Sequence, residues 1–178
     1  MHRKIQAFLI QHGCAGVAEH TARVALRARQ LAAAHGADPD AAEVAGWLHD
    51  IGNVIPDAER VAAALAYGIP VLPEEAACPT ILHQKLSARL ARRYYGITDE
   101  AVLAAAGCHT TLRPGAALLD KVVFLADKLD WAGPHREAVT AALQNSIDAA
   151  ILTWIQRQRF QVIHPWLRAA TEELTREV

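Results

Sequence analysis

Residues 115–130 read GAALLDKVVFLADKLD, and the spacing of their apolar side chains predicts a helix with one buried face. Leu119, Val123, Ala126 and Asp127 share this face, because residues three, four or seven positions apart lie on the same side of a helix. The polar residues that fall off this stripe are Asp120, Lys121 and Lys128. The pattern therefore aims one acid, Asp127, at the core.

The rest of the chain shows the same helical character. It is rich in Ala, Leu, Arg, Gln and Glu, which are favourable in helices, and turn signals cut it into segments of helical length. We therefore predict an all-α fold. The expected helices are 2–12, 17–35, 39–51, 57–67, 80–95, 99–109, 115–130, 135–158 and 165–176.

Length and composition are typical of a globular protein. The 178 residues suit a single domain, 1–178, with 52% hydrophobic and 21% charged residues. A formal net charge of −1 gives no long-range attraction to nucleic acid or to an anionic membrane, so neither is an expected partner. The three cysteines are odd in number and form no CxxC pair, which predicts a cytoplasmic protein without disulfides. The sequence leaves open whether the protein forms a homodimer.

Three of the predicted helices each place one histidine on an apolar face. These are His20 (with Val24, Ala28 and Leu31), His83 (with Leu86 and Leu90) and His109 (with Val102 and Ala106). A fourth helix ends at His49-Asp50, just before Gly52, a residue typical of helix termini. We expect the three histidines to point inward, as Asp127 does.

These inward residues together indicate a metal centre. A buried carboxylate without a partner is costly, so proteins neutralise it, pair it with a cation or use it as a metal ligand. Imidazole and carboxylate together suit Fe, Mn, Zn or similar divalent ions. A single inward histidine is more often a hydrogen-bonded core residue than a ligand. Along the chain, however, one His is followed by a His-Asp pair, two more His and an inward Asp. This combination favours a metal, because a separate core role would otherwise be needed for each residue.

Other conspicuous residues have simpler structural explanations. Cys108 adjoins His109, but neighbours on a helix point apart, so we expect a core cysteine rather than a nucleophile. A basic helical face is expected to be solvated surface, and its members are Lys85, Arg89, Arg92 and Arg93. The tryptophans are expected in the core or at an interface, with base stacking as the alternative for one of them; they are Trp47, Trp131, Trp154 and Trp166.

At this point the sequence resembles a known family. His20, His49-Asp50 and Asp127 match the H...HD...D signature of the HD phosphohydrolase superfamily, and the chain looks closest to its YqeK-like branch of symmetrical diadenosine tetraphosphate hydrolases. The segments that carry the resemblance are EHTARVA (19–25), WLHDIGNVIP (47–56), YGIP (67–70), ILH (81–83), CHTTLRPGAALLDKVVFLAD (108–127) and VIHP (162–165). The resemblance implies an orthogonal helical bundle, a bound iron or comparable metal, and cleavage of the dinucleoside tetraphosphate into two ADP.

Three positions depart from that branch where it is expected to carry a basic residue that contacts phosphate. They are Val17, Asn53, in place of the lysine of HD-x-x-K, and Gly133. The metal ligands match while the phosphate cradle is thinned. If Asn53 faces a phosphate, Asn53→Lys is expected to strengthen binding of the tetraphosphate.

The hypothesis is therefore metal-assisted hydrolysis of a phosphoanhydride, with one or two ions, of iron or alternatively Mn or Zn. His20, His49, Asp50 and Asp127 would hold an ion, while His83 and His109 would bind a second ion or contact phosphate. Asp50 is placed to bridge two ions or to orient the attacking water, so Asp50, His83 and His109 are the expected catalytic residues. Expected substrate contacts are Thr110, Arg113 and Asn53 for phosphate and, by resemblance alone, Ile163 and His164 for the nucleoside.

Two other functions remain open from the sequence. The missing basic residues would permit a nucleotidase or pyrophosphatase that acts on other nucleotides. They would also permit a non-catalytic protein that keeps its metal and senses a nucleotide. A panel of nucleotides separates the first alternative from the tetraphosphatase, and tight binding without a metal-dependent product would favour the second.

Overall fold

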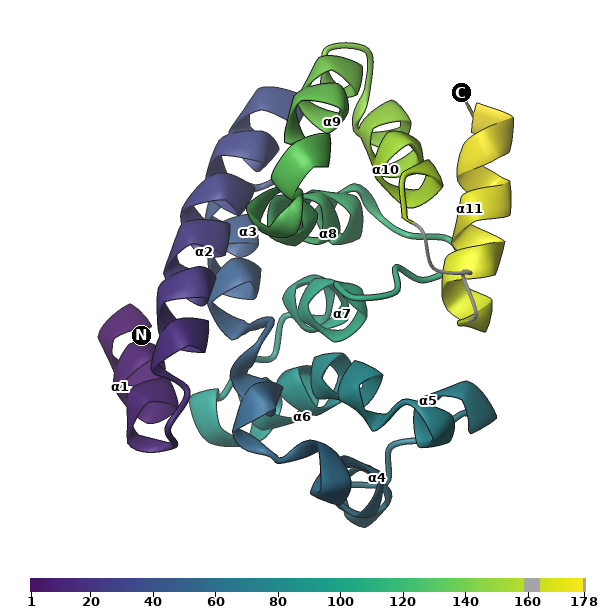
Figure 1. Cartoon of the computed structure of the whole chain (residues 1–178). Helices are drawn as coiled ribbons and strands as arrows, with labels where there is room; N and C mark the ends of the chain where they lie inside the picture. The colour runs from purple at the N-terminus through teal and green to yellow at the C-terminus, as the bar shows by residue number, and fades with distance from the viewer. Residues whose placement is uncertain (159–163, 178) are drawn as a thin grey trace.

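The computed structural model describes residues 1–158 and 164–177, and within these ranges every regular element is a helix (Figure 1). This confirms the predicted all-α class. The α-helices are α1 (His2–Gln11), α2 (Ala15–His35), α3 (Pro39–Leu48), α4 (Asp57–Ala66), α5 (Pro73–Ala77), α6 (His83–Tyr95), α7 (Glu100–Cys108), α8 (Leu118–Trp131), α9 (Arg136–Leu143), α10 (Ile147–Gln156) and α11 (Pro165–Glu177). Short 3-10 helices are η1 (Ile51–Val54), η2 (Pro79–Leu82) and η3 (Gly133–His135).

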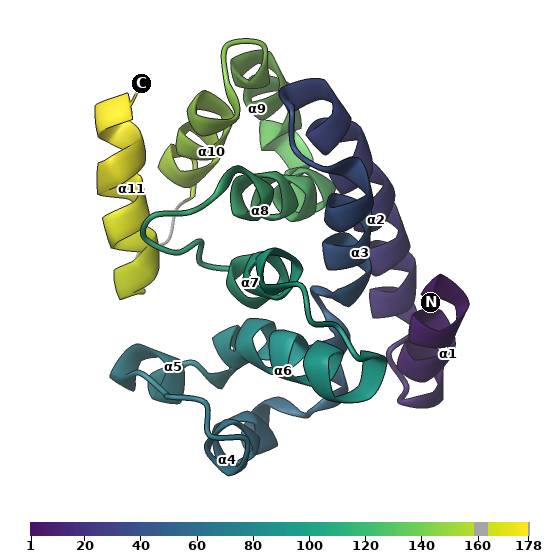
Figure 2. The ribbon, with the colours of Figure 1, turned by 180° about the vertical axis from the view of Figure 1, so that it is seen from behind.

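The helices cross rather than run parallel. Figure 1 shows α2 and α11 lengthwise at the two sides and α7 and α8 nearly end-on between them. Seen from behind in Figure 2, α3 lies beside α2, and both α7 and α8 contact α3. Helices α4 to α6 lie on one side of this centre, while α9 and α10 lie on the other. The arrangement is the orthogonal bundle that the family resemblance implied.

Two sequence-based helix assignments were wrong. The expected single helix 135–158 is two helices, α9 and α10, separated at 144–146. The break follows from local chemistry, because Gln144-Asn145-Ser146 is polar and the Ser146 hydroxyl accepts from the Ala149 N–H at 2.9 Å as the N-cap of α10. In addition, residues 68–79, which lie between two of the expected helices, contain α5, which starts with Pro73 at its first position.

Two glycines allow close approach of helices near the centre of the molecule. A Cβ on Gly46 would lie 2.6 Å from the Ala25 Cα, so this glycine lets α3 pack directly on α2. A Cβ on Gly52 would lie 2.3 Å from the His83 carbonyl oxygen, and the Gly52 N–H donates to the Ser87 hydroxyl at 2.8 Å. Gly52 was expected to terminate a helix, but α3 ends at Leu48 and Gly52 lies within η1. Its role is to bring the end of α3 against the start of α6.

The stripe on α8 points inward as predicted, and Asp127 is buried. Asp120 and Lys128, which lie off the stripe, are buried as well, because α8 is covered by α2, α3, α7 and α10. The Lys128 ammonium lies 2.7 Å from an Asp127 carboxylate oxygen and also packs over the Phe124 and Trp154 rings. In the described ranges, no helix is long and apolar enough to span a membrane.

Candidate metal centre

Five helices meet where the predicted ligands lie. His20 comes from α2, His49 and Asp50 follow α3, His83 begins α6, His109 follows α7, and Asp127 lies on α8. All but His83 are buried, and only 12% of the His83 side chain is exposed. The structure therefore brings all six predicted ligands together, as their inward orientation suggested.

Three of the histidines share one local design. Each occupies the position that ends a helical element, and its ring Nδ1 donates to the carbonyl three residues earlier. The distances are 2.6 Å from His49 to Gly46, 2.5 Å from His83 to Thr80 and 2.8 Å from His109 to Ala106. The last turn of a helix leaves its carbonyls without backbone partners, so these oxygens are free to accept. Because a carbonyl can only accept, the Nδ1 atoms carry the protons.

His20 is oriented by a carboxylate that the sequence analysis missed. Its Nδ1 lies 2.8 Å from Asp130 Oδ2, and Asp130 also pairs with Arg23 and Arg27 of α2. A signal for Asp130 was present, since it follows Asp127 by three residues and so shares its side of α8. Carboxylates that hold the distal nitrogen of a metal-binding histidine raise the basicity of the ring and fix its orientation.

With Nδ1 engaged in every ring, the four Nε2 atoms converge on a shared space. His20 Nε2 lies 3.3 Å from His49 Nε2, 3.1 Å from Asp127 Oδ1 and 3.7 Å from Asp50 Oδ2. This first group is closed by the 3.6 Å separation of His49 Nε2 and Asp50 Oδ2. Ligands of an ion with bonds of about 2.1 Å lie roughly 3.0 to 3.4 Å apart. The two shortest separations lie in this range, whereas those to Asp50 Oδ2, and the 3.9 Å from His49 Nε2 to Asp127 Oδ1, are longer.

A second group lies on the other side of Asp50. His83 Nε2 and His109 Nε2 are 3.0 Å apart, and they lie 3.2 Å and 3.5 Å from Asp50 Oδ1. The two oxygens of Asp50 thus face different groups of nitrogens. The roles expected for Asp50 from the sequence, to bridge two ions or to orient the attacking water, stay predictions.

The residues themselves fit a cation in this space. Burial lowers the pKa of His109 to about 4, so this ring is neutral near pH 7. A neutral ring that donates from Nδ1 presents a lone pair at Nε2, and His109 Nε2 lies 3.0 Å from His83 Nε2. This lone pair suits a divalent ion, because imidazole nitrogens bind Fe, Mn and Zn as neutral donors.

The two carboxylates are ionised and therefore suited to bind a cation. Burial acts to raise the pKa of Asp50, but the neighbouring rings of His49, His109 and His83 outweigh it and hold that pKa well below its ordinary value. Burial also acts to raise the pKa of Asp127, and here the Lys128 charge and the His20 hydrogen bond lower it. One Asp127 oxygen faces Lys128 while the other faces His20. Only the oxygen that faces His20 is directed at the ligand group of His20, His49 and Asp50.

Among the predicted substrate contacts, Thr110 lies at the centre. Its hydroxyl oxygen is 3.2 Å from His83 Nε2 and 3.1 Å from His109 Nε2. The adjoining loop is held by Gln84, whose amide oxygen accepts from the N–H groups of Thr110 and Thr111. Sequence reasoning missed Gln84, because a buried glutamine next to His83 has no distinctive pattern.

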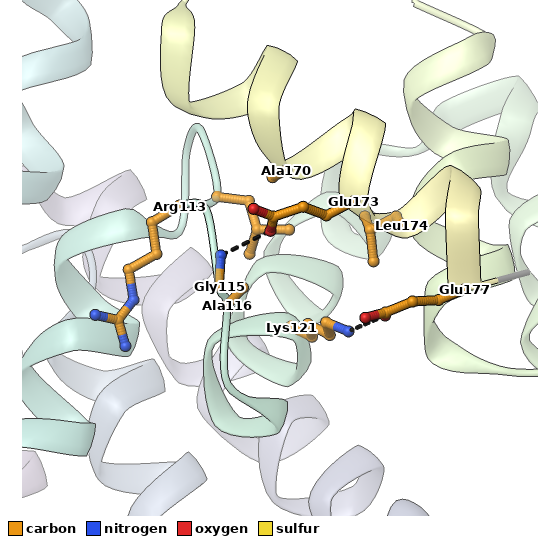
Figure 3. Close-up of a pocket in the computed structure, with 9 residues that line it drawn as sticks. Arg113, Gly115, Ala116, Lys121, Ala170, Glu173, Leu174 and Glu177 are labelled. Carbon is orange, nitrogen blue, oxygen red and sulfur yellow. Dashed lines mark hydrogen bonds and ion pairs between the residues drawn. The ribbon is translucent and has the colours of Figure 1, made fainter.

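Arg113 is engaged elsewhere. Its Nε donates to Asp120 at 2.8 Å, and the residue lines a cavity of about 50 Å³ between the loop after α7 and helix α11 (Figure 3). In this cavity the Gly115 N–H donates to Glu173, and Lys121 pairs with Glu177. The described contacts of Arg113 therefore hold the loop that precedes α8, rather than reaching the histidines.

Two other predicted contacts, Asn53 and His164, already have protein partners. Asn53 Oδ1 accepts from Arg60 Nη2 at 2.8 Å, and the Arg60 guanidinium is buried. His164 is buried too, with its Nε2 3.2 Å from a Glu75 carboxylate oxygen. Ile163 lies outside the described residues. Cys108 is a buried core thiol, as expected, and burial raises its pKa, which keeps it protonated.

Comparison with known proteins places the chain among homologues. The HD domain family matches residues 17–132. An uncharacterized protein in the pepC 5′ region of Lactococcus lactis subsp. cremoris is 44% identical, over 76% of this chain and 73% of its own. The symmetrical bis(5′-nucleosyl)-tetraphosphatase of Bacillus subtilis is 31% identical, over 77% of this chain and 74% of its own. A predicted HD superfamily hydrolase involved in NAD metabolism from Clostridium acetobutylicum has a crystal structure that matches with a TM-score of 0.86 and 25% identity, covering 100% of this chain and 98% of that one.

The matched range contains the whole centre. Residues 17–132 include all six predicted ligands and also Asp130, whereas His164 and its helix lie beyond it. Geometry and similarity thus indicate the same part of the chain.

Proposed function

The chain belongs to the HD domain family, and we propose that it hydrolyses diadenosine tetraphosphate symmetrically into two ADP at the centre around Asp50. The observation that carries this proposal is the convergence of four histidine Nε2 atoms and two ionised carboxylates. The Nδ1 of each of these histidines is held by a hydrogen bond, to Asp130 in His20 and to a backbone carbonyl in the other three. The substrate is inferred from relatives such as the Bacillus subtilis tetraphosphatase. The three free thiols support a place in the reducing cytoplasm.

The residues divide into two ligand groups that share Asp50. His20, His49, Asp50 and Asp127 would hold one divalent transition metal, for which we propose iron, with Mn and Zn compatible with the same donors. His83 and His109, together with the other oxygen of Asp50, would hold a second ion or a phosphoryl group. Bound divalent metal supplies Lewis-acid stabilisation of phosphoryl charge and activates water at neutral pH.

The chain's own groups position the reacting phosphate and the water. Asp50 is ionised and faces both groups, so it can accept a hydrogen bond from the attacking water and direct it. The Thr110 hydroxyl lies beside the His83 and His109 nitrogens, where it can donate to a phosphoryl oxygen. The Gln84 bonds to the Thr110 loop keep this donor in place before substrate arrives.

The test combines metal analysis with product analysis. Protein purified anaerobically should carry at least one transition metal per chain and convert diadenosine tetraphosphate to ADP alone. Asp50→Asn should abolish both metal retention and turnover, whereas Asp40→Asn, at an exposed aspartate, should change neither. Folded wild type that binds no divalent metal, or that yields ATP and AMP, would contradict the proposal.

A nucleotide panel tests the two alternatives. Faster turnover of mononucleotides or other nucleotides than of the tetraphosphate would favour a nucleotidase or pyrophosphatase. Tight binding with no metal-dependent product would favour a sensing protein.

A further inference from the structure

Three arginines gather around Asp130, just behind His20. Arg23 and Arg27 reach its carboxylate from α2 at 2.9 Å and 3.2 Å, and Arg136 donates to its backbone carbonyl at 3.3 Å. One further carboxylate, Glu19, lies near Arg23. Three positive charges therefore face two negative ones, which leaves the cluster with one excess positive charge.

The arginines also keep donors that can reach a ligand. Arg23 is bound to Asp130 through Nε and Nη2, and 54% of its side chain is exposed. Arg27 and Arg136 line a hollow of about 280 Å³ between α2, α8 and α9. Guanidinium groups with free N–H donors on accessible surface bind phosphate oxygens in a forked geometry.

Trp131 lies beside His20 and next to Asp130, the residue that the cluster surrounds. It follows Asp130 at the end of α8, and its ring lies 5.0 Å from the His20 ring at an angle of 44°. The residue is nevertheless 69% exposed, more than any other large hydrophobic residue in the described ranges. Such exposure excludes the core role for Trp131 and leaves the two other roles expected for the tryptophans, an interface or base stacking. An exposed indole beside a phosphate-binding centre is suited to stack on a base.

We propose that Trp131 and the arginine cluster, Arg23, Arg27 and Arg136, form a docking surface for one nucleoside end of a nucleotide. The base stacks on Trp131, and phosphates outside the metal centre contact the arginines. This inference rests on the proposed nucleotide function and adds to it the residues that select a nucleotide over an inorganic polyphosphate. The surface also supplies cationic groups that Val17 and Gly133 lack.

A purely structural role explains only part of this arrangement. Asp130 needs a single arginine to balance its charge, and His20 already holds its Oδ2. Arg136 touches only the backbone of Asp130 among the described contacts, so it does little to orient His20. Burial of Trp131 would have been expected if its task were to pack against His20 alone.

Calorimetric titration with ADP and with inorganic tripolyphosphate separates base from phosphate contacts. Trp131→Ala should weaken ADP binding about 5- to 30-fold and leave tripolyphosphate binding within about twofold, because only ADP carries a base. Trp131→Phe, which keeps an aromatic face, should retain most of the ADP affinity. Arg136→Gln should weaken both ligands about three- to tenfold.

Two matched variants serve as controls. Tyr94→Ala removes another exposed aromatic residue, on α6, and Arg29→Gln removes an exposed arginine of α2 that pairs with Asp40 and Glu43. Neither should change the affinity for ADP or for tripolyphosphate. Thermal melting of each variant checks that it is folded.

The outcomes separate this surface from the proposed enzyme function. Wild type that binds no ADP, or a folded Trp131→Ala protein that binds ADP as tightly as wild type, overturns the surface even if the tetraphosphate is hydrolysed. Equal loss of ADP and tripolyphosphate in Trp131→Ala also overturns it, because this would mean collapse of the His20 side of the centre. A selective loss of ADP binding in a protein that hydrolyses no nucleotide supports the surface and overturns only the enzyme assignment.

Discussion

The carboxylate of Asp130 should control metal affinity although it lies outside both ligand groups. Asp130→Asn keeps the shape of the side chain and an oxygen that can accept from His20 Nδ1, but it removes the negative charge. The bond at 2.8 Å then changes from a charge-assisted to a neutral hydrogen bond. Such a change costs about 1 to 1.5 kcal/mol of the interaction with His20.

Two further effects set the size of the change. A less basic His20 ring binds the ion more weakly, and loss of such supporting partners typically reduces metal affinity about 10- to 100-fold. The ion pairs with Arg23 and Arg27 add little, because these side chains are 54% and 27% exposed and such pairs contribute only about 0 to 1 kcal/mol. We therefore expect a 10- to 100-fold weaker metal affinity and a loss of about 1 to 2 kcal/mol in unfolding free energy.

Competition with a chromophoric zinc chelator measures this affinity, and thermal melting measures stability. The matched control is Asp148→Asn, which removes a partly exposed carboxylate that pairs with Lys121 on the α10 side of α8. The control should lower stability slightly and leave metal affinity unchanged. Wild-type affinity in a folded Asp130→Asn protein would refute the reasoning, as would an equal loss of affinity in both variants.

Three other changes test separate features of the structure. Asn53→Lys should cost about 1 to 3 kcal/mol of stability without a gain in tetraphosphate affinity, because it removes one acceptor of the buried Arg60 guanidinium and places a second positive charge beside it. A tighter calorimetric binding constant would contradict this and restore the expectation from sequence. Glu75→Gln should lower the unfolding free energy in denaturant by about 3 kcal/mol, since it leaves Lys85 and His164 without their buried carboxylate. Burial acts to raise the pKa of Glu75, but His164, the Leu72 N–H and the Lys85 ammonium outweigh it and lower that pKa, so the contribution of Glu75 should be present above the ordinary carboxyl pKa and lost as the pH falls through the lowered one. Acid should therefore destabilise wild type more than Glu75→Gln, and equal destabilisation of the two proteins would contradict this. Joint replacement of the thiols by Ala or Ser should leave turnover within a few fold, and loss of activity in a folded, metal-replete protein would show a role for one of Cys14, Cys78 and Cys108.

Local signals were sufficient for most helices and for the direction of the ligands. Asp38 and Asp99 cap the starts of α3 and α7 with their side chains, and such caps act on neighbouring backbone alone. The inward faces of Asp127 and His109 follow from helical periodicity, which is equally local. Periodicity therefore selected His20, His83, His109 and Asp127 before any fold was known, while His49 and Asp50 were selected as a pair at the end of a helix. Their roles as ligands stay predictions until a metal is measured.

The tertiary structure decided how these residues are grouped and what supports them. The division of the nitrogens between the two oxygens of Asp50 depends on how α2, α3, α6, α7 and α8 cross. Asn53 and Arg60 lie on two different elements, η1 and α4, and His20 and Asp130 are 110 positions apart, so neither contact follows from the period of a single helix. The exposure of Trp131 was missed because composition predicts burial for tryptophan on average, whereas the end of α8 leaves this one uncovered. Sequence periodicity determines which side of a helix is apolar, but the distances between side chains on different helices arise only when the helices pack.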